Sequence, residues 1–86
     1  MALYFFEVAD PEFSIRDFDG TECTDGNAAL EEALRTLCEV AADQPEKYNG
    51  RPLRIDVLDD AQRNVFSCEI QLTTTVHALN RLRSAA

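Results

Sequence analysis

The strongest constraint on the fold is a change of hydrophobic period partway along the chain. Residues 3–9 are rich in aromatic and aliphatic side chains, and residues 13–18 alternate between apolar and polar side chains. Both patterns are typical of β-strands. From 27 to 43, apolar residues recur instead at steps of three and four, the spacing of one helical face. Two alternating segments follow, at 53–59 and 65–72. The chain therefore reads strand, strand, helix, strand, strand.

This order predicts an α+β domain, β-β-α-β-β, in which one long helix covers one face of a four-stranded, mainly antiparallel sheet. An 86-residue chain has room for one domain, which we expect over residues 1–72. Residues 73–86 form a C-terminal tail. The tail favours about equally a short helix starting at Thr74 or Thr75 and a frayed end of the last strand.

The predicted helix has a clear start and a clear inner face. Asp25 is placed as its N-cap, where a carboxylate accepts hydrogen bonds from the first free backbone N–H groups. The polar segment 43–52, with two prolines and Asn49-Gly50, predicts a loop after the helix. The apolar positions expected to face the sheet are Leu30, Ala33, Leu34, Leu37, Cys38 and Ala41.

One helix covers one face of a sheet, which leaves the other face to be explained. The first strand is apolar on both sides, and Phe18 and Leu58 depart from the regular inward pattern. We expect these side chains to be covered by the tail or by a second subunit. The residues predicted for such an interface are Leu3, Phe5, Phe18 and Leu58.

The charge is strongly asymmetric along the chain. The formal net charge is −8, and residues 1–43 hold eleven acids and two bases, whereas 44–86 hold five acids and six bases. An acidic front half disfavours direct nucleic-acid binding and favours a basic protein partner or contact with a second copy. Acids that merely keep a small protein soluble are the simpler interpretation.

The three cysteines favour a reducing cellular compartment and do not form the pattern of a metal or disulfide site. Cys23, Cys38 and Cys68 are odd in number and widely spaced, without a CxxC pair, which disfavours a disulfide framework or a zinc site. We expect reduced, buried thiols in a cytoplasmic protein. No apolar run is long enough to span a membrane, and the N-terminal residues lack the basic start of a signal peptide.

The acidic stretch "DFDGTECTDG", residues 17–26, is the nearest approach to a metal site. Asp17, Asp19 and Glu22 supply oxygen ligands, so a metal- or ligand-binding function is one alternative. The spacing does not match a helix-loop-helix calcium loop, which needs a Glu at the twelfth place, where Ala28 stands. Backbone turns and a helix cap explain the same residues, so we predict no metal, no cofactor and no catalytic residue here.

His77 is the only histidine, and it has no recognisable nucleophile or carboxylate partner in sequence. Fingerprints of hydrolases, metalloproteases, P-loop proteins and dinucleotide-binding enzymes are also missing from the sequence. We therefore expect a non-catalytic protein.

The chain resembles a family of short bacterial proteins of unknown function. The motifs that carry this resemblance are Tyr4-Phe5-Phe6, Asp10, Ile15-Arg16-Asp17, Gly20-Thr21-Glu22, Asp25 and Glu32-Ala33-Leu34. Matches over the later part, up to about residue 72, are looser. Gln62 stands where the family usually has a glycine, so the resemblance implies a different turn there. The family implies no activity and no catalytic residues.

A weaker similarity is to antitoxin domains of the HicB type, which place a strand pair before a helix with a run like Leu30-Glu31-Glu32-Ala33-Leu34. The main expectation is a small, non-catalytic interaction or dimerisation module that forms a homodimer. The alternatives are an acidic, antitoxin-like regulator that neutralises a basic partner, and a protein that binds a metal or ligand through residues 17–22.

Overall fold

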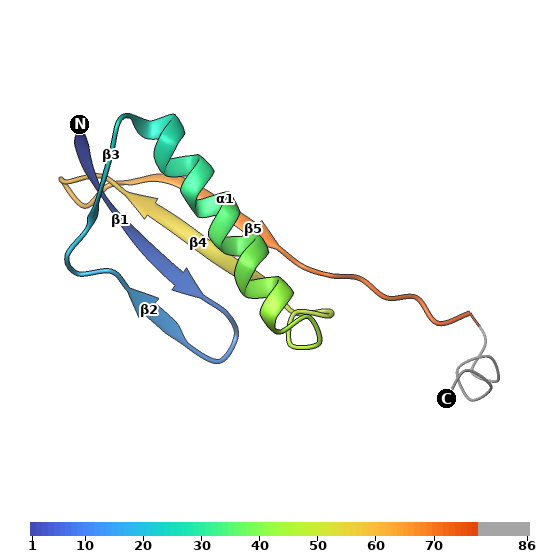
Figure 1. Ribbon diagram of the computed structural model, residues 1–86. Helices are drawn as coiled ribbons and strands as arrows, with labels where there is room; N and C mark the ends of the chain where they lie inside the picture. The colour runs from blue at the N-terminus through green and yellow to red at the C-terminus, as the bar shows by residue number, and fades with distance from the viewer. Residues whose placement is uncertain (78–86) are drawn as a thin grey trace.

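The computed structural model describes residues 1–77 as two layers, a single helix lying across one face of a β-sheet (Figure 1). The elements are β1 (Ala2–Ala9), β2 (Ser14–Arg16), β3 (Thr21–Cys23), α1 (Gly26–Asp43), β4 (Leu53–Leu58) and β5 (Asn64–Ile70). The α+β class predicted from the sequence is confirmed. Within residues 1–77, no helix has the length and apolarity needed to cross a membrane.

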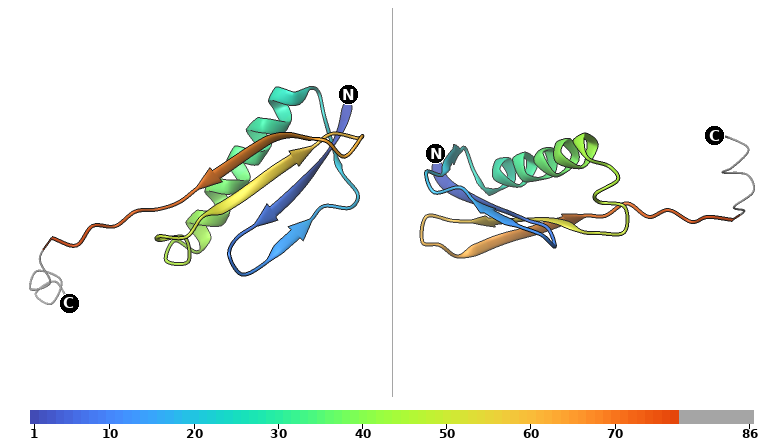
Figure 2. Two further views of the ribbon diagram at one scale, coloured as in Figure 1. Left: turned by 180° about the vertical axis from the view of Figure 1, so that it is seen from behind. Right: turned by 90° about the horizontal axis from the view of Figure 1, so that it is seen from below.

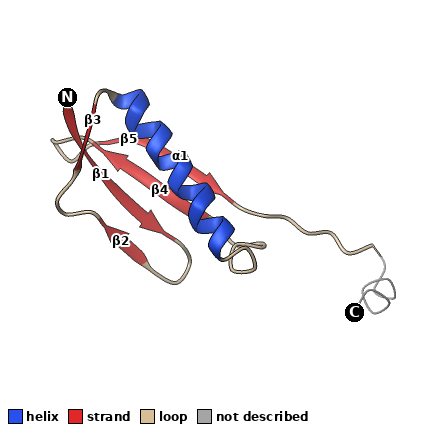
Figure 3. Cartoon of the chain, viewed as in Figure 1, coloured by secondary structure: helices blue, strands red, loops and turns tan. Residues whose placement is uncertain are grey.

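The sheet is antiparallel and has five strands instead of the predicted four (Figure 3). The order is β2-β1-β4-β5, and β3 pairs with the first residues of β1. The segment 13–18, expected to be one strand, is paired only from Ser14 to Arg16. The chain then bends through 17–20, and β3 pairs with Ala2–Tyr4. Asp17 and Gly20 build this bend, as described below, and so divide the expected strand pairing in two.

The core lies between α1 and the sheet. The helix buries a stripe of residues four apart: Ala29, Ala33, Leu37 and Ala41. The prediction that Leu34 and Cys38 face the sheet is wrong, because both are exposed. Small alanines on the buried stripe let the helix backbone approach the sheet closely, and this leaves the larger neighbouring side chains on the flank.

The sheet contributes its largest fully buried side chains from β4, where Leu53, Ile55 and Val57 have no exposed surface. Burial of one such side chain contributes roughly 1.5–3 kcal/mol. Around them, half-buried residues of β1 and β5 complete the core: Tyr4, Phe6, Val8, Phe66, Cys68 and Ile70. The central position of β4, between β1 and β5, explains why its inner face is the driest part of the sheet.

The tight turn between β4 and β5 contains a residue in the left-handed region. Gln62 has φ +64°. The Asp59 carboxylate supports the turn by accepting hydrogen bonds from the backbone N–H groups of Ala61 and Arg63. Gln62 therefore adopts the left-handed backbone conformation that favours glycine. Replacement of the family's usual glycine by glutamine has not changed φ at this position to a negative value.

Beyond β5 the chain remains extended and leaves the domain. Leu72 donates its N–H to the Tyr48 carbonyl at 3.0 Å and accepts from the Gly50 N–H at 2.8 Å. Residues 73–77 then run clear of the sheet (Figures 1 and 2). They are not helical, and the remainder of the expected short helix, including Leu79 and Leu82, lies outside the described residues.

Candidate functional site: the open face of the sheet

The described part of the chain covers only one face of the sheet, and the opposite face is the main candidate surface. In the right-hand view of Figure 2 the helix lies on one side of the sheet and no helix lies on the other. Strand alternation and pairing place side chains of β1, β4 and β5 on this open face. They are Leu3, Phe5, Glu7, Arg54, Asp56, Leu58, Ser67 and Glu69.

One half of the open face is apolar. Phe5 of β1 pairs directly with Leu58 of β4, and Leu3 precedes them on the same side of β1. All three side chains are half-buried. Phe18, in the bend between β2 and β3, is 83% exposed. The four residues predicted for an interface thus come from two neighbouring strands and the adjoining bend, and three of them lie on the open face.

The other half of the open face is polar, and two of its carboxylates are paired with arginines. Arg16 contacts the Glu7 carboxylate at 2.7 Å. Arg54 Nε and the Ser67 hydroxyl both donate to Asp56 Oδ1, at 2.9 and 2.7 Å. Although burial favours the neutral acid, the hydrogen bonds from Ser67 and Arg54 outweigh it and lower the pKa of Asp56. This half of the face therefore holds two ion pairs beside the exposed carboxylate of Glu69.

The acidic stretch from residue 17 forms a turn. Asp17 Oδ1 accepts from the backbone N–H groups of Asp19 and Gly20, at 3.2 and 3.1 Å, and its Oδ2 accepts from the Thr21 hydroxyl at 3.3 Å. Both Asp17 oxygens thus act within the bend. Asp19 and Glu22 are exposed, and within residues 1–77 no three His, Cys, Asp or Glu side chains are grouped to hold a metal ion.

Gly20 closes that bend against the open face. Its φ is +79°, and a Cβ added there would lie 2.9 Å from Leu3 Cγ and 3.0 Å from a ring carbon of Phe5. A glycine is required both for the backbone conformation and for the contact. The bend therefore supports two of the apolar side chains of the open face.

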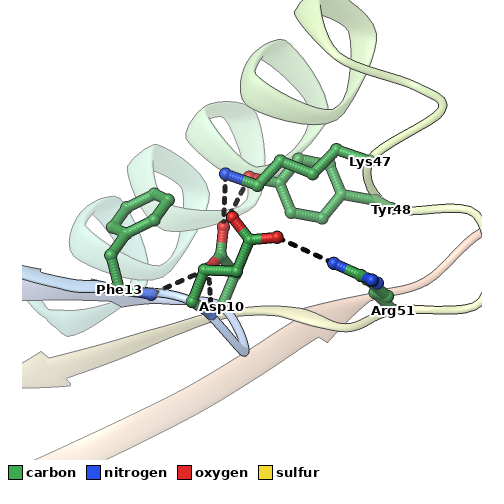
Figure 4. Close-up of polar contacts among 6 residues, drawn as sticks. Asp10, Phe13, Lys47, Tyr48 and Arg51 are labelled. Carbon is green, nitrogen blue, oxygen red and sulfur yellow. Dashed lines mark hydrogen bonds and ion pairs between the residues drawn. The ribbon is translucent and has the colours of Figure 1, made fainter.

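A second polar cluster joins the end of β1 to the loop after α1 (Figure 4). Asp10 Oδ1 accepts from the backbone N–H groups of Glu12 and Phe13, and its Oδ2 accepts from Lys47 Nζ at 2.9 Å and the Tyr48 hydroxyl at 3.2 Å. The Asp10 side chain has no exposed surface. Lys47 Nζ also lies 4.4 Å from the centroid of the Phe13 ring.

The electrostatics of this cluster are those of a stable ion pair. Burial alone would raise the pKa of Asp10, but the Lys47 ammonium, the two backbone N–H groups and the Tyr48 hydroxyl lower it on balance. The bond to Asp10 in turn raises the pKa of Lys47. Every Asp10 oxygen is engaged, so the cluster ties the β1–β2 connection to the loop before β4 and holds Tyr48 in the core.

The remaining nucleophilic or titratable candidates lie apart from the open face. Cys23 is buried and Cys68 is half-buried, and burial raises the pKa of both thiols. Cys38 is exposed on α1, so the expectation that all three thiols are buried is wrong for this residue. All three are free thiols. His77 lies exposed in the extended tail.

Two predictions made from local pattern are confirmed at this level, and one feature was missed. Asp25 caps α1, accepting from the Ala28 N–H at 2.9 Å, and Cys23 plugs the edge of the core. The role of Tyr48 was missed, because it lies in a segment read as a loop yet is only 1% exposed. An aromatic residue within a polar, proline-containing stretch is the signal that could have indicated it.

Taken together, these features define a small α+β domain, with one helix on an antiparallel sheet and a second face that no described helix covers. Residues 3–71 match a family described as a domain of unknown function, DUF6894, and the chain belongs to that family. Neither the curated proteins nor the solved structures contain a match to this chain.

Proposed function

We propose that this protein is a non-catalytic interaction module that associates with a second copy through the open face of its sheet. The observation that carries the proposal is the apolar half of that face, where Leu3, Phe5 and Leu58 are half-buried and the bend at Gly20 covers them only in part. Phe18, in the same bend, is 83% exposed. Contiguous apolar surface of this kind marks interaction sites in folded proteins.

The charge distribution favours a second copy as the partner. The net charge of −8 would repel another copy where acids are unpaired. On the open face, however, Glu7 and Asp56 are each paired with an arginine of the same face. Self-association there brings together a partly apolar surface on which Glu7 and Asp56 are compensated, with Glu22 and Glu69 on the flanking strands, and it leaves the acidic helix pointing outward.

The test is the molar mass in solution, measured by light scattering at low and high salt. We expect an even number of 9.6 kDa chains at both salt concentrations, because apolar contacts are not screened. Leu58→Lys and Phe18→Lys should each halve the number of copies. The matched control is Leu34→Lys, the same change at an exposed helix position, which should leave the mass unchanged. A monomeric chain, or equal effects of Leu58→Lys and Leu34→Lys, would reject the open-face contact.

A second candidate function is the neutralisation of a basic partner by an acidic, antitoxin-like protein. The supporting observation is the outer surface of α1, where Glu31 and Glu39 are exposed and the one cation of the helix, Arg35, is already paired with Glu32. A basic protein that co-purifies at low salt, is released by high salt and is lost from a Glu31→Lys/Glu39→Lys variant would support it. Recovery of no basic protein at low salt would argue against it.

A further inference from the structure

Among residues 1–77, two neighbouring segments leave backbone groups on their outer side unpaired. Strand β5 is the last strand of the sheet, and no described strand pairs with its outer edge. Its backbone N–H and C=O groups on that side are available for pairing. Residues 71–77, here called the arm, continue from β5 as exposed, extended chain and run away from the domain (Figures 1 and 2).

The orientation of the arm is set where it leaves the sheet. Leu72 directs its N–H and C=O inward, to Tyr48 and Gly50. Because these groups alternate along an extended chain, Gln71, Thr73 and Thr75 direct theirs to the outer edge. Ser67 and Glu69 of β5 do the same, so β5 from Phe66 onward and the arm present one continuous outer edge.

The side chains of the arm are those of a strand. Residues 73–76 are three threonines and a valine, all β-branched. Leu72 and Val76 are 38% and 53% exposed. An exposed, β-branched and extended segment is a typical partner for an open sheet edge.

We propose that the arm pairs antiparallel with the outer edge of β5 in a second copy, and that the second copy's arm pairs reciprocally with β5 of the first. The two-fold axis passes between the two Gln71 residues. Residue 73 then lies opposite Glu69 of the other copy, and residue 75 opposite Ser67, so that residues with outward backbone groups face each other, as an antiparallel ladder requires.

The register also matches side chains on the helix side of the sheet. It places Leu72 opposite Ile70 and Val76 opposite Phe66, and these two β5 residues are only half-buried in a single copy. Each apolar residue of the arm thus covers an apolar residue of β5. Shifting the two-fold axis to Ile70 would instead place Thr74 opposite Phe66, and a shift of one residue in pairing would misalign the hydrogen-bonding groups.

This ribbon does not use the open face, so it goes beyond the proposed function and stands independently of it. If both contacts form, two different two-fold interfaces give an assembly of four chains when their axes cross at right angles, and a longer open chain when they do not. If only the ribbon forms, the assembly has two chains.

The first test is a pair of proline substitutions in the full chain. Thr75→Pro removes an N–H that faces the other copy, whereas Val76→Pro removes one that faces away from it and loses only the side-chain contact with Phe66. Thr75→Pro should halve the number of copies measured by light scattering at a protein concentration at which Val76→Pro remains assembled. Both sites lie outside the folded body, and circular dichroism should confirm an intact fold. An unchanged mass for Thr75→Pro, or equal losses in both variants, would overturn the ribbon.

The second test traps the register itself. In a Cys38→Ala background, Gln71→Cys places two thiols on the two-fold axis, with Cα atoms about 5.5 Å apart, within disulfide range. Mild oxidation should give a covalent dimer on a denaturing gel. Thr73→Cys is the control, because its symmetry mate lies roughly 13 Å away along the ribbon. Equal cross-linking of the two variants, or none with Gln71→Cys, would count against the proposal.

The two variants distinguish the ribbon from the open-face contact. Loss of copies with Thr75→Pro but not with Leu58→Lys would retain the ribbon and reject the open-face contact. Loss with Leu58→Lys but not with Thr75→Pro would retain the proposed function and reject the ribbon.

Discussion

Gly20 shows how much of the open face depends on single residues. Asp17 holds the bend by accepting two backbone N–H groups, and Gly20 completes it in the left-handed region while lying against Leu3 and Phe5. Gln62 also has a positive φ, although its side chain makes that conformation less favourable than it is for glycine. In the acidic stretch, Asp17 thus stabilises a backbone turn through hydrogen bonds to its carboxylate.

Gly20 and Gly50 offer a matched comparison at the residue scale. Both have positive φ, +79° and +83°, but a Cβ at Gly50 meets nothing within 4 Å. Gly50→Ala should therefore cost only backbone strain, about 1–2 kcal/mol. Gly20→Ala should cost roughly 1–3 kcal/mol more, because Leu3 or Phe5 must move. Urea unfolding of the two variants measures this, and equal costs would show that the contact with β1 does not matter.

At the scale of elements, the helix is the part most completely specified by local signals. Asp25 accepts from the Ala28 N–H, and the alanine stripe of α1 faces β4 and β5. The strands depend more on one another. β2 and β3 have three residues each and persist only because β1 pairs with both. An isolated three-residue strand has no stability of its own.

The N-cap gives the prediction for α1. Asp25→Ala should lower the free energy of unfolding by about 1 kcal/mol, because the Ala28 N–H loses its acceptor. Asp25→Asn keeps a side-chain oxygen in the same place and should retain most of the stability. Thermal melts should show a drop of about 4–8 °C for the alanine variant. A comparable drop for Asp25→Asn would mean that charge, not the hydrogen bond, stabilises the helix start.

For the molecule as a whole, three aspartates link stability to acidity. The pKa values of Asp10, Asp56 and Asp59 all lie below the ordinary 3.8. At Asp10 and Asp56, burial would raise the pKa, but the hydrogen bonds to the carboxylate together outweigh it. At Asp59, the hydrogen bond from the Arg63 backbone N–H is the largest single effect and lowers the pKa. The unfolded chain therefore binds more protons just below pH 3.8. The stability from these groups is complete above that pH and is lost as pH falls through the folded-state values.

Melting temperatures measured between pH 2 and 7 should therefore be level above about pH 5 and fall steeply below 3.8. Asp10→Asn should be less stable at neutral pH and should have a shallower fall in acid, since one of the three linked groups is removed. If the slope of Asp10→Asn equals that of the unmodified chain, the buried contact with Lys47 does not carry this linkage.

The sequence by itself determined the elements whose signals are local: the helix from its period and its cap at Asp25, the alternating strands, and the class of fold. Local patterns do not carry the relative placement of these elements. Pairing of β1 with β3, burial of Tyr48 against Asp10 and the rotation of α1 toward its alanines were decided by tertiary structure. Each depends on residues distant in sequence that meet only when the helix and sheet pack together. This packing leaves one face of the sheet without a helix and, among the described residues, leaves the outer edge of β5 unpaired.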